Sequence, residues 1–244
     1  MKPIILIPAR LASTRLPNKP LADIAGAPMI VRVWRQAVAA EIGPVVVAAG
    51  EREIAAAVEA AGGRAVLTDP ALPSGSDRIF QALQTFDGEG VHDVVVNLQG
   101  DLPALDPQAI RDVVSALAST GADIATLAAE IDEPADFDNP NVVKPVVVWD
   151  VSGMRGRALY FTRARAPAGE GPLFHHIGIY AYKREALARF VHLAPSPLEL
   201  REKLEQLRAL EAGMTIAVAR VDEVPLSVDT RADLVRARVL LRGD

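Results

Sequence analysis

Cysteine is absent from the 244 residues of this sequence, which excludes a disulfide framework and any metal site built on thiolates. Long apolar runs are absent too, since no stretch approaches the roughly 20 residues that a helix needs to span a bilayer. The apolar segment near the N-terminus is too short and wrongly flanked to be a signal peptide. We therefore expect a cytoplasmic protein with no membrane insertion.

The sequence also lacks an excess of basic residues. Lys and Arg number 26 against 31 Asp and Glu, which gives a net charge of −5, and the pI is 5.5. Proteins that bind nucleic acid usually meet the phosphate backbone with a basic face. We therefore expect no binding to nucleic acid.

Acidic residues are missing from the start of the chain, and this absence is the most informative one. Asp23 is the first acid, whereas Lys2, Arg10, Arg15 and Lys19 all precede it. The last three lie in the loop "ARLASTRLPNKPL", directly after an apolar run that predicts a buried strand. An acidic protein has thus gathered positive charge at the end of a strand, where open α/β sheets bind their ligands.

Strands and helices alternate in the predicted fold. We expect strands over residues 4–7, 45–49, 65–67, 94–98, 123–129, 142–150, 177–182 and 215–220. Helices are expected over residues 29–40, 51–61, 77–86, 107–119, 197–212 and 230–241. Strands separated by helices of this length predict right-handed βαβ units, and so an α/β fold whose parallel sheet is covered on both faces. The segments that contain Pro and Gly have the character of loops, so residues 1–244 are expected to form a single domain.

The loop after the first strand is suited to bind a polyphosphate. Arginine forks hold phosphate oxygens in pairs, and a lysine adds a compact positive charge. Pro8, Pro17 and Pro20 stiffen this loop, which argues against the alternative of a merely solvated basic surface. The sequence contains neither G-x-G-x-x-G nor G-x-x-x-x-G-K-[ST], which excludes a Rossmann dinucleotide site and a Walker ATPase.

Two aspartates are candidate ligands for Mg²⁺, which prefers oxygen and is typically held by one or two carboxylates together with phosphates. Asp101 ends the motif "QGD" after a predicted strand, where an ordinary turn aspartate is the alternative. Asp229 precedes the last predicted helix in "SVDT", where helix capping is the stronger alternative from the residues alone.

Three further segments carry polar groups whose roles the residues alone leave open. "PSGSDR", residues 73–78, enters a helix whose N–H groups could receive a base or an anion, and a plain helix cap is equally consistent. His175 and His176 are neighbours on a predicted strand and so point to opposite faces, which prevents them from chelating one metal together. "LEQLR", residues 204–208, has the pattern of a packed helix with one solvated face.

These segments together resemble a known family. The order and spacing found in the 3-deoxy-manno-octulosonate (KDO) cytidylyltransferases are matched by "IPARLASTRLPNKPL", "SGSDR", "VNLQGD", "NPNVVK", "ALYFTR", "HHIGIYAY", "PSPLE…LEQLR" and "VDT". The resemblance covers nearly the whole chain. The related N-acylneuraminate cytidylyltransferases share the opening type of loop but have neither "ALYFTR" nor the "PSPLE…LEQLR" segment, so the resemblance is specific to the KDO branch.

The resemblance implies a fold, a reaction and an assembly. The fold would be α/β, with three α/β/α layers around a mostly parallel, Rossmann-like nucleotidyltransferase sheet and a small extension over residues 131–195 for dimerisation and sugar binding. The reaction would transfer CMP from CTP to KDO with release of pyrophosphate, for lipopolysaccharide biosynthesis, with Mg²⁺ as the cofactor. The assembly would be a homodimer that takes small-molecule substrates.

The same resemblance implies roles for individual residues. The catalytic residues would be Arg10, Arg15, Lys19 and Asp101. The residues that bind CTP would be Pro8, Ala9, Arg10, Lys19, Ser74, Gly75, Ser76 and Arg78. The residues that contact the sugar acid would be Gln99, Arg163, His176, Tyr180, Glu205 and Gln206. The ligands of Mg²⁺ would be Asp101 and Asp229.

Three features depart from the family pattern, one of them a short loop over residues 166–172, and two other functions compete with the first. Leu102 stands where the family usually has an acid beside the metal ligand, and "PLSVDT" replaces the usual "GTGVDT". These changes bear on which sugar acid is accepted, so 8-amino-KDO or a nonulosonate is an alternative substrate. The alternative from another class is a catalytically idle nucleotide-binding protein. Such a protein would lack a metal carboxylate or a phosphate cation, whereas candidates for both are present.

Overall fold

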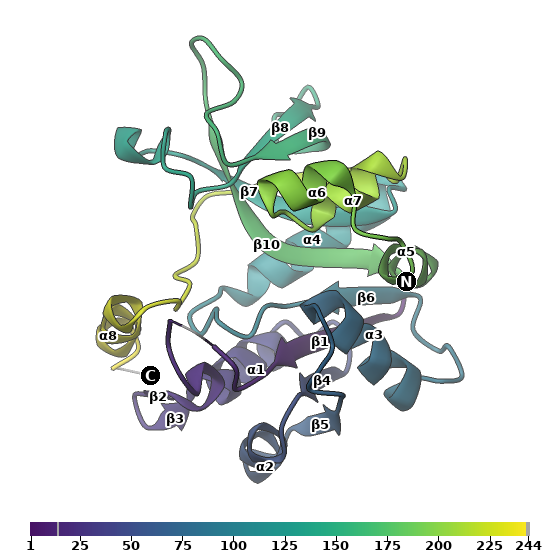
Figure 1. Ribbon diagram of the computed structural model, residues 1–244, viewed down its shortest axis with the longest axis vertical. Coiled ribbons are helices and arrows are strands. Elements are labelled where there is room, and N and C mark those ends of the chain that lie inside the picture. The colour runs from purple at the N-terminus through teal and green to yellow at the C-terminus, as the bar shows by residue number, and fades with distance from the viewer. Residues whose placement is uncertain (14, 243–244) are drawn as a thin grey trace. The chain divides into compact units, whose positions relative to one another are not determined.

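A computed structural model describes residues 1–13 and 15–242 of the chain (Figure 1). Its contacts divide the chain into two compact units, one made of Met1–Arg111 with Pro225–Asp244 and the other of Asp112–Val224. The second unit contains the whole of the predicted extension over residues 131–195. The single domain over residues 1–244 stays a prediction. No helix in the described part of the chain is both long enough and apolar enough to cross a membrane.

The first unit is built on a parallel sheet. Its strands are β1 (Pro3–Ala9), β4 (Val45–Ala49), β5 (Arg64–Leu67) and β6 (Val94–Asn97), and their order across the sheet is β5-β4-β1-β6. Ile5 pairs with Val45 on one side and with Val96 on the other. Every side chain from Ile4 to Ile7 is fully buried. Burial on both faces explains why this strand reads as a continuous apolar run without alternation.

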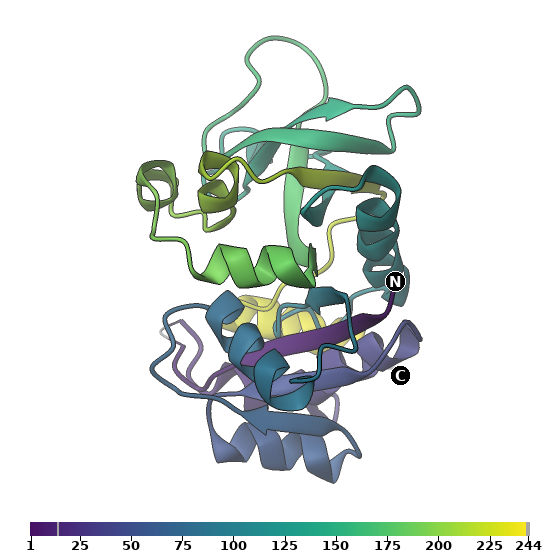
Figure 2. The same cartoon turned by 90° about the vertical axis from the view of Figure 1, so that its right-hand side faces the viewer.

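Three helices of the first unit connect these strands. They are α1 (Met29–Ala39), α2 (Arg52–Ala60) and α3 (Gly75–Phe86). The chain passes from β1 through β4 to β5 in one direction and then returns across the sheet to β6. Since parallel crossovers are right-handed, α1 and α2 cover one face and α3 covers the other. Figure 2 shows α3 beside β1, as the contacts between the two elements require.

The C-terminal segment completes the first unit. Helix α8 (Arg231–Leu240) packs against the short hairpin of β2 (Asp23–Ile24) and β3 (Ala27–Pro28), which follows the 3-10 helix η1 (Lys19–Leu21). The two segments share a small apolar core, in which the buried residues are Leu16, Ile24, Met29, Val228, Leu234, Ala237 and Leu241. Burial of a side chain as large as Leu or Ile contributes about 1.5–3 kcal/mol. This core therefore fixes the end of the chain beside the N-terminal loop.

The second unit has a mixed sheet. Its strands are β7 (Ile124–Glu130), β8 (Lys144–Trp149), β9 (Arg155–Thr162), β10 (Phe174–Lys183) and β11 (Ile216–Val221), in the order β10-β7-β11-β9-β8. The β7–β11 pair is parallel, and the other pairs are antiparallel. The sheet curls, so that its two edge strands β10 and β8 approach each other. The His176 N–H in β10 donates to the carbonyl of Val143, the residue before β8, at 2.8 Å.

The helices of the second unit correct one prediction. Helix α4 (Pro107–Thr120) leads into the unit, which also contains η2 (Pro134–Asp136), α5 (Arg184–Val191), α6 (Pro197–Glu202) and α7 (Gln206–Glu211). The single helix predicted over residues 197–212 is wrong, because the chain turns at Lys203, whose φ of 56° lies in the left-handed region. Strand β9 and helix α5 were not predicted.

The fold class predicted from the sequence is confirmed. A mixed sheet with many parallel strands is flanked by helices. The all-parallel part of the sheet is confined to the first unit.

Candidate functional site

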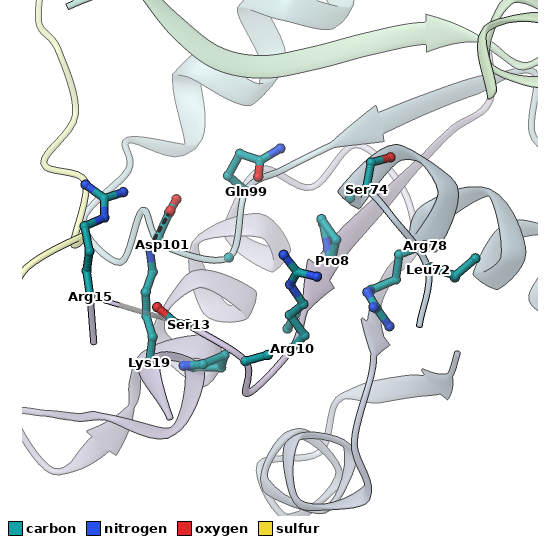
Figure 3. Close-up of a pocket in the computed structure, with 15 residues that line it drawn as sticks. Pro8, Arg10, Ser13, Arg15, Lys19, Leu72, Ser74, Arg78, Gln99 and Asp101 are labelled. Carbon is teal, nitrogen blue, oxygen red and sulfur yellow. Dashed lines mark hydrogen bonds and ion pairs between the residues drawn. The ribbon is translucent and has the colours of Figure 1, made fainter. Parts of the chain in front are cut away.

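A cavity of about 410 Å³ opens in the first unit at the carboxyl ends of its strands (Figure 3). Its walls come from the loop after β1, the loop after β6 and the start of α3. The strand order places β4 on one side of β1 and β6 on the other, so the sheet's connections diverge between β1 and β6. Ligands of open α/β sheets bind at such a switch point. The two polar strand ends identified in the sequence are the ends that meet there.

Most of the residues predicted to bind the nucleotide line this cavity. The predicted residues in its walls are Pro8, Ala9, Arg10, Arg15, Lys19, Ser74, Gly75, Arg78, Gln99 and Asp101. Ser76, on the first turn of α3, is 2% exposed and is not among the residues that line the cavity. Its contact with the nucleotide stays a prediction.

Glycines allow these walls to approach one another closely. A Cβ atom on Gly75 would lie 3.3 Å from the Pro8 ring, and one on Gly100 would lie 3.0 Å from the Pro8 carbonyl oxygen. The first contact joins the start of α3 to the end of β1, and the second joins the ends of β6 and β1. A larger residue at either position would push these walls apart.

The charged centre of the cavity is Lys19. Its Nζ lies 2.8 Å from Asp101 Oδ2 and 2.9 Å from Asp229 Oδ1, and its side chain is 15% exposed. Burial opposes the positive charge of Lys19, but the two carboxylates outweigh that effect and raise its pKa above the ordinary value. Arg15 Nη2 lies 3.1 Å from the same Asp229 oxygen. Two cations of the N-terminal loop and two distant aspartates thus meet at one point.

Asp229 does not cap the last helix, which was the alternative from its residues. Thr230 is the N-cap of α8, because its hydroxyl accepts from the Asp233 N–H at 3.2 Å and Asp233 in turn accepts from the Thr230 N–H. The neighbouring Val228 N–H donates to the Asp101 carbonyl at 2.9 Å. This bond ties the two segments together and leaves the Asp229 carboxylate to face Lys19.

Arg78 is a fixed part of the cavity wall. It is 2% exposed, and its guanidinium donates to Thr68 Oγ1 at 2.6 Å and to the Asp69 carbonyl at 3.2 Å. Burial lowers the pKa of Arg78, and the nearby charge of Arg10 acts in the same direction. Two guanidinium groups therefore converge on one side of the cavity, which favours an anionic ligand.

Four residues predicted to contact the sugar acid lie close to one another in the second unit. His176 Nε2 lies 2.9 Å from Thr126 Oγ1, and the His176 ring contacts the ring of Tyr180 with centroids 5.5 Å apart. Burial lowers the pKa of His176 to about 3 and raises the pKa of Tyr180 well above its ordinary value. The negative charge of Glu205 also raises the Tyr180 pKa, so Glu205 lies within electrostatic range of this pair.

Gln206 is the most unusual member of this group. It is 7% exposed, and its Nε2 has no hydrogen-bond partner among the described residues. A buried amide left unpaired costs about 1–3 kcal/mol, so such groups are rare in folded proteins. An unpaired donor at this position fits a pocket whose ligand completes the hydrogen bond.

Arg163 and Gln99 are the other two residues predicted to contact the sugar acid, and the structure gives each of them partners of its own. Arg163 Nε donates to the Glu202 carbonyl at 2.8 Å and Nη1 donates to the Pro140 carbonyl at 2.9 Å. The guanidinium therefore holds the backbone at the end of α6, before the turn at Lys203. Gln99 lies in the cavity of the first unit, where its Nε2 donates to Asn97 Oδ1 at 3.4 Å.

The sequence interpretation missed several residues of the cavity. Ala12, Ser13, Pro20 and Leu72 also line it. Ala12, Ser13 and Pro20 lie within the cationic loop, so the motif itself was the signal for them. Leu72 carries no chemical signature, and only its place in the loop before α3 could have indicated it.

Comparisons with known proteins agree on a family. The cytidylyltransferase family profile matches residues 4–216. A 3-deoxy-manno-octulosonate cytidylyltransferase of Parvibaculum lavamentivorans is 66% identical over 98% of this chain and 92% of its own length. One of Rhodospirillum centenum is 67% identical over 98% of this chain and 93% of its own.

Solved structures give the same result. A CMP:2-keto-3-deoxy-manno-octonic acid synthetase complexed with CTP superposes with a TM-score of 0.90 at 36% identity, over 99% of this chain and 98% of that one. A nucleotidyl transferase from Methanothermobacter, at 14% identity and a TM-score of 0.62 over 99% of both chains, shares the fold. The protein is therefore a member of the cytidylyltransferase family.

Proposed function

We propose that the protein transfers CMP from CTP to KDO, giving CMP-KDO and pyrophosphate. The observation that carries this proposal is the cavity at the β1/β6 switch point, where Arg10, Arg15 and Lys19 converge with Asp101. The names of the relatives and the CTP complex of the similar structure support the choice of both substrates. In the biology expected from the resemblance, the product would serve lipopolysaccharide biosynthesis.

The triphosphate of CTP would lie against the cationic side of the cavity. Arg10 and Lys19 would neutralise the phosphates, and Arg15, which is 66% exposed at the rim, would reach the leaving pyrophosphate. The start of α3 presents N–H groups and Ser74 to the opposite wall, beside Pro8 and Arg78. This wall would receive the cytosine, because backbone groups and a fixed arginine can read the polar edge of a base.

The residues present fit a bound Mg²⁺. Asp101 and Asp229 already hold one cationic atom, Lys19 Nζ, at 2.8 and 2.9 Å. Within the described ranges, no group of three or more His, Cys, Asp or Glu side chains could hold a metal alone. Two carboxylates completed by phosphate oxygens are a typical Mg²⁺ environment. Asp101 and Asp229 would hold the Mg²⁺, which would supply positive charge that neutralises the phosphates and acidifies the attacking sugar hydroxyl.

In this reaction the protein positions the substrates and neutralises their charge. The anomeric hydroxyl of the sugar acid would attack the α-phosphorus in line with the departing pyrophosphate, a reaction in which the enzyme needs no covalent intermediate. Lys19 would exchange its contacts with the two carboxylates for contacts with phosphate oxygens when CTP binds. Arg10 would hold the charge that develops on the leaving group.

The sugar acid would be bound by the polar group of the second unit. His176 is neutral at physiological pH and can exchange hydrogen bonds with a sugar hydroxyl. Gln206 offers an unpaired Nε2, and Glu205 and Tyr180 lie nearby. Arg163 and Gln99 were expected to join them, and for Arg163 the carbonyl contacts described above favour a role in supporting the pocket. The substrate's hydroxyls and carboxylate suit such neutral and acidic hydrogen-bonding groups.

A direct assay tests this proposal against its alternatives. The protein is incubated with CTP and Mg²⁺, KDO, 8-amino-KDO or neuraminate is added in turn, and released pyrophosphate is measured. We expect turnover with KDO. Faster turnover with 8-amino-KDO or neuraminate would show that this sugar acid, and not KDO, is the preferred substrate. Binding of CTP without any turnover would identify a catalytically idle nucleotide-binding protein.

The homodimer and the cytoplasmic location stay predictions. Both derive from the sequence and its resemblance to the family. Light scattering on the purified protein measures the mass directly, and a value near twice 26.0 kDa is expected.

A further inference from the structure

Glu51 lies beside the cavity without belonging to the set predicted from the sequence. It follows Gly50 at the carboxyl end of β4, the strand that neighbours β1 on the side away from β6. The third parallel strand end therefore also carries a charged side chain. A carboxylate beside a polyphosphate site needs an explanation, because its charge repels the ligand.

The side chain of Glu51 reaches the phosphate loop. Glu51 is the N-cap residue of α2, but its side chain makes no capping bond to that helix. Instead, Oε2 accepts a hydrogen bond from the Leu11 N–H at 2.8 Å, across 40 positions of sequence. Leu11 follows Arg10 directly, so this bond fixes the backbone at the point where the arginine leaves β1.

The same carboxylate lies within electrostatic range of Arg78 in the cavity wall. The negative charge of Glu51 favours the charged form of Arg78, whereas the charge of Arg10 opposes it. Gly50 lets these groups pack, because a Cβ there would lie 3.0 Å from Arg78 Nη1 and 3.3 Å from the Arg10 Cβ. Figure 3 shows Arg10 and Arg78 on neighbouring parts of the cavity. Glu51 thus both anchors the loop through the Leu11 N–H and balances the charge of Arg78.

We propose that Glu51 is a positioning residue of the nucleotide site, which holds the Leu11 amide so that Arg10 faces the cavity before the triphosphate arrives. It acts through the backbone of the loop and through Arg10, and it does not itself contact the phosphates. The hydrogen bond between Glu51 and the Leu11 N–H lowers the conformational entropy that the loop loses when CTP binds. This inference rests on CTP being the substrate, as proposed above.

The sign of one mutational effect separates positioning from simple charge. If Glu51 acted only as a nearby negative charge, its removal would strengthen the binding of an anion. If it positions the loop, Glu51→Ala weakens binding. We expect the dissociation constants of CTP and of pyrophosphate to rise about tenfold in Glu51→Ala, the scale of a lost hydrogen bond to a charged group.

Two further variants complete the experiment. Glu51→Gln keeps an oxygen that can accept from the Leu11 N–H and should bind CTP within about threefold of the unaltered protein. Glu53→Ala removes an exposed carboxylate from the first turn of the same helix and should leave binding unchanged. Isothermal calorimetry with CTP and with pyrophosphate, each in Mg²⁺ buffer, measures the dissociation constants of all three variants.

Steady-state kinetics distinguishes positioning from a structural role. We expect Glu51→Ala to raise KM for CTP about tenfold while kcat and KM for the sugar acid change less than about threefold. The inference is overturned if Glu51→Ala binds CTP as tightly as the unaltered protein or more tightly. It is also overturned if Glu51→Gln is as defective as Glu51→Ala, or if melting temperature falls while KM is unchanged. Failure of the unaltered protein to bind CTP would instead refute the proposed substrate.

Discussion

The two units of the molecule hold their polar groups in different ways. In the first unit, charged side chains pair with one another at the ends of parallel strands, and Lys19 lies between Asp101 and Asp229. In the second unit, the residues predicted to contact the sugar acid are mostly neutral: His176 lies beside the rings of Phe161 and Tyr180, and Glu205 is the one acid of the group. The first arrangement suits a highly charged ligand, and the second suits one with many hydroxyls.

This difference predicts how each group responds to change. Charged groups at the cavity act through long-range attraction, so altering them should affect nucleotide binding and catalysis strongly. Neutral buried groups act through single hydrogen bonds, whose loss costs about 1–3 kcal/mol when a partner is left unpaired. Variants in the first unit should therefore cause larger losses of activity than variants in the second.

The largest effect is expected for Asp101→Asn. This change removes one of two carboxylates that hold Lys19 and, in the proposed reaction, Mg²⁺. Loss of a charge-stabilising group of this kind lowers turnover about 10²-fold or more. Pyrophosphate release measures it. Asp106→Asn, at an exposed position five residues further along the chain, is the matched control and should retain activity. Unchanged turnover in Asp101→Asn would contradict the assignment of this carboxylate to the reaction.

The next largest effect is expected for Lys19→Met, which keeps most of the side chain's length and removes its charge. Without the ammonium, the phosphates of CTP lose a buried cation and face two unbalanced carboxylates, so affinity should fall about 10- to 100-fold. Calorimetric titration with CTP measures this change.

Salt provides the control for Lys19→Met. Attraction between exposed charges weakens as ionic strength rises. CTP affinity of the unaltered protein should therefore fall with added salt, and that of Lys19→Met should fall less steeply. Equal slopes would mean that Lys19 makes no electrostatic contribution to binding.

Much of the first unit could be predicted because its physical signals are local. The buried strand at Ile4–Ile7 is a continuous apolar run. The helix predicted over residues 77–86 is present but begins two residues earlier, because Ser74 is its N-cap. The charged loop and Asp101 each follow such a strand, and parallel strands bring their carboxyl ends to one edge. The sequence alone thus indicated that these two segments meet.

The remaining features depend on contacts between distant segments. A left-handed lysine such as Lys203 has no sequence signal, so the break between α6 and α7 could not be predicted. Strand β9 begins with Arg155, Gly156 and Arg157, so its first residues do not show the alternation of apolar and polar side chains that indicates a strand. The hydrogen bonds from Arg163 to the carbonyls of Glu202 and Pro140 could not be predicted either, because these residues come together only in the folded chain.

A smaller effect, with opposite signs for stability and function, is expected for Gln206→Met. Methionine has a similar volume and removes an amide that has no partner in the described structure, so stability should rise by up to about 1 kcal/mol. The sugar acid should lose a hydrogen bond, so its KM should rise about tenfold, while CTP affinity stays the same. Urea unfolding and steady-state kinetics measure the two effects. A fall in stability would show that the amide is paired in the folded protein.

A further effect is expected in the second unit, where stability should depend on pH. His176 has a folded pKa of about 3, well below its ordinary value, because burial disfavours its charged form. Between these two values the unfolded chain binds a proton that the folded protein does not, so stability falls as the pH is lowered. The slope contributed by His176 is at most about 1.4 kcal/mol per pH unit, and it vanishes above the ordinary His pKa of roughly 6.5.

The window between pH 6.5 and pH 5 isolates this effect, because carboxylates with lowered pKa values, such as Asp123 and Asp233, protonate in more acidic solution. His175 also has a pKa lowered by burial and adds to the slope in the same direction. His176→Phe, which preserves the contact with Phe161 and Tyr180, should therefore flatten the dependence in part, and the double variant with His175→Gln should flatten it further. Urea unfolding at several pH values measures the slopes. Equal slopes for His176→Phe and the unaltered protein would mean that His176 takes up its proton in the folded state as readily as in the unfolded chain, and the contrast between a charged first site and a neutral second one would then fail.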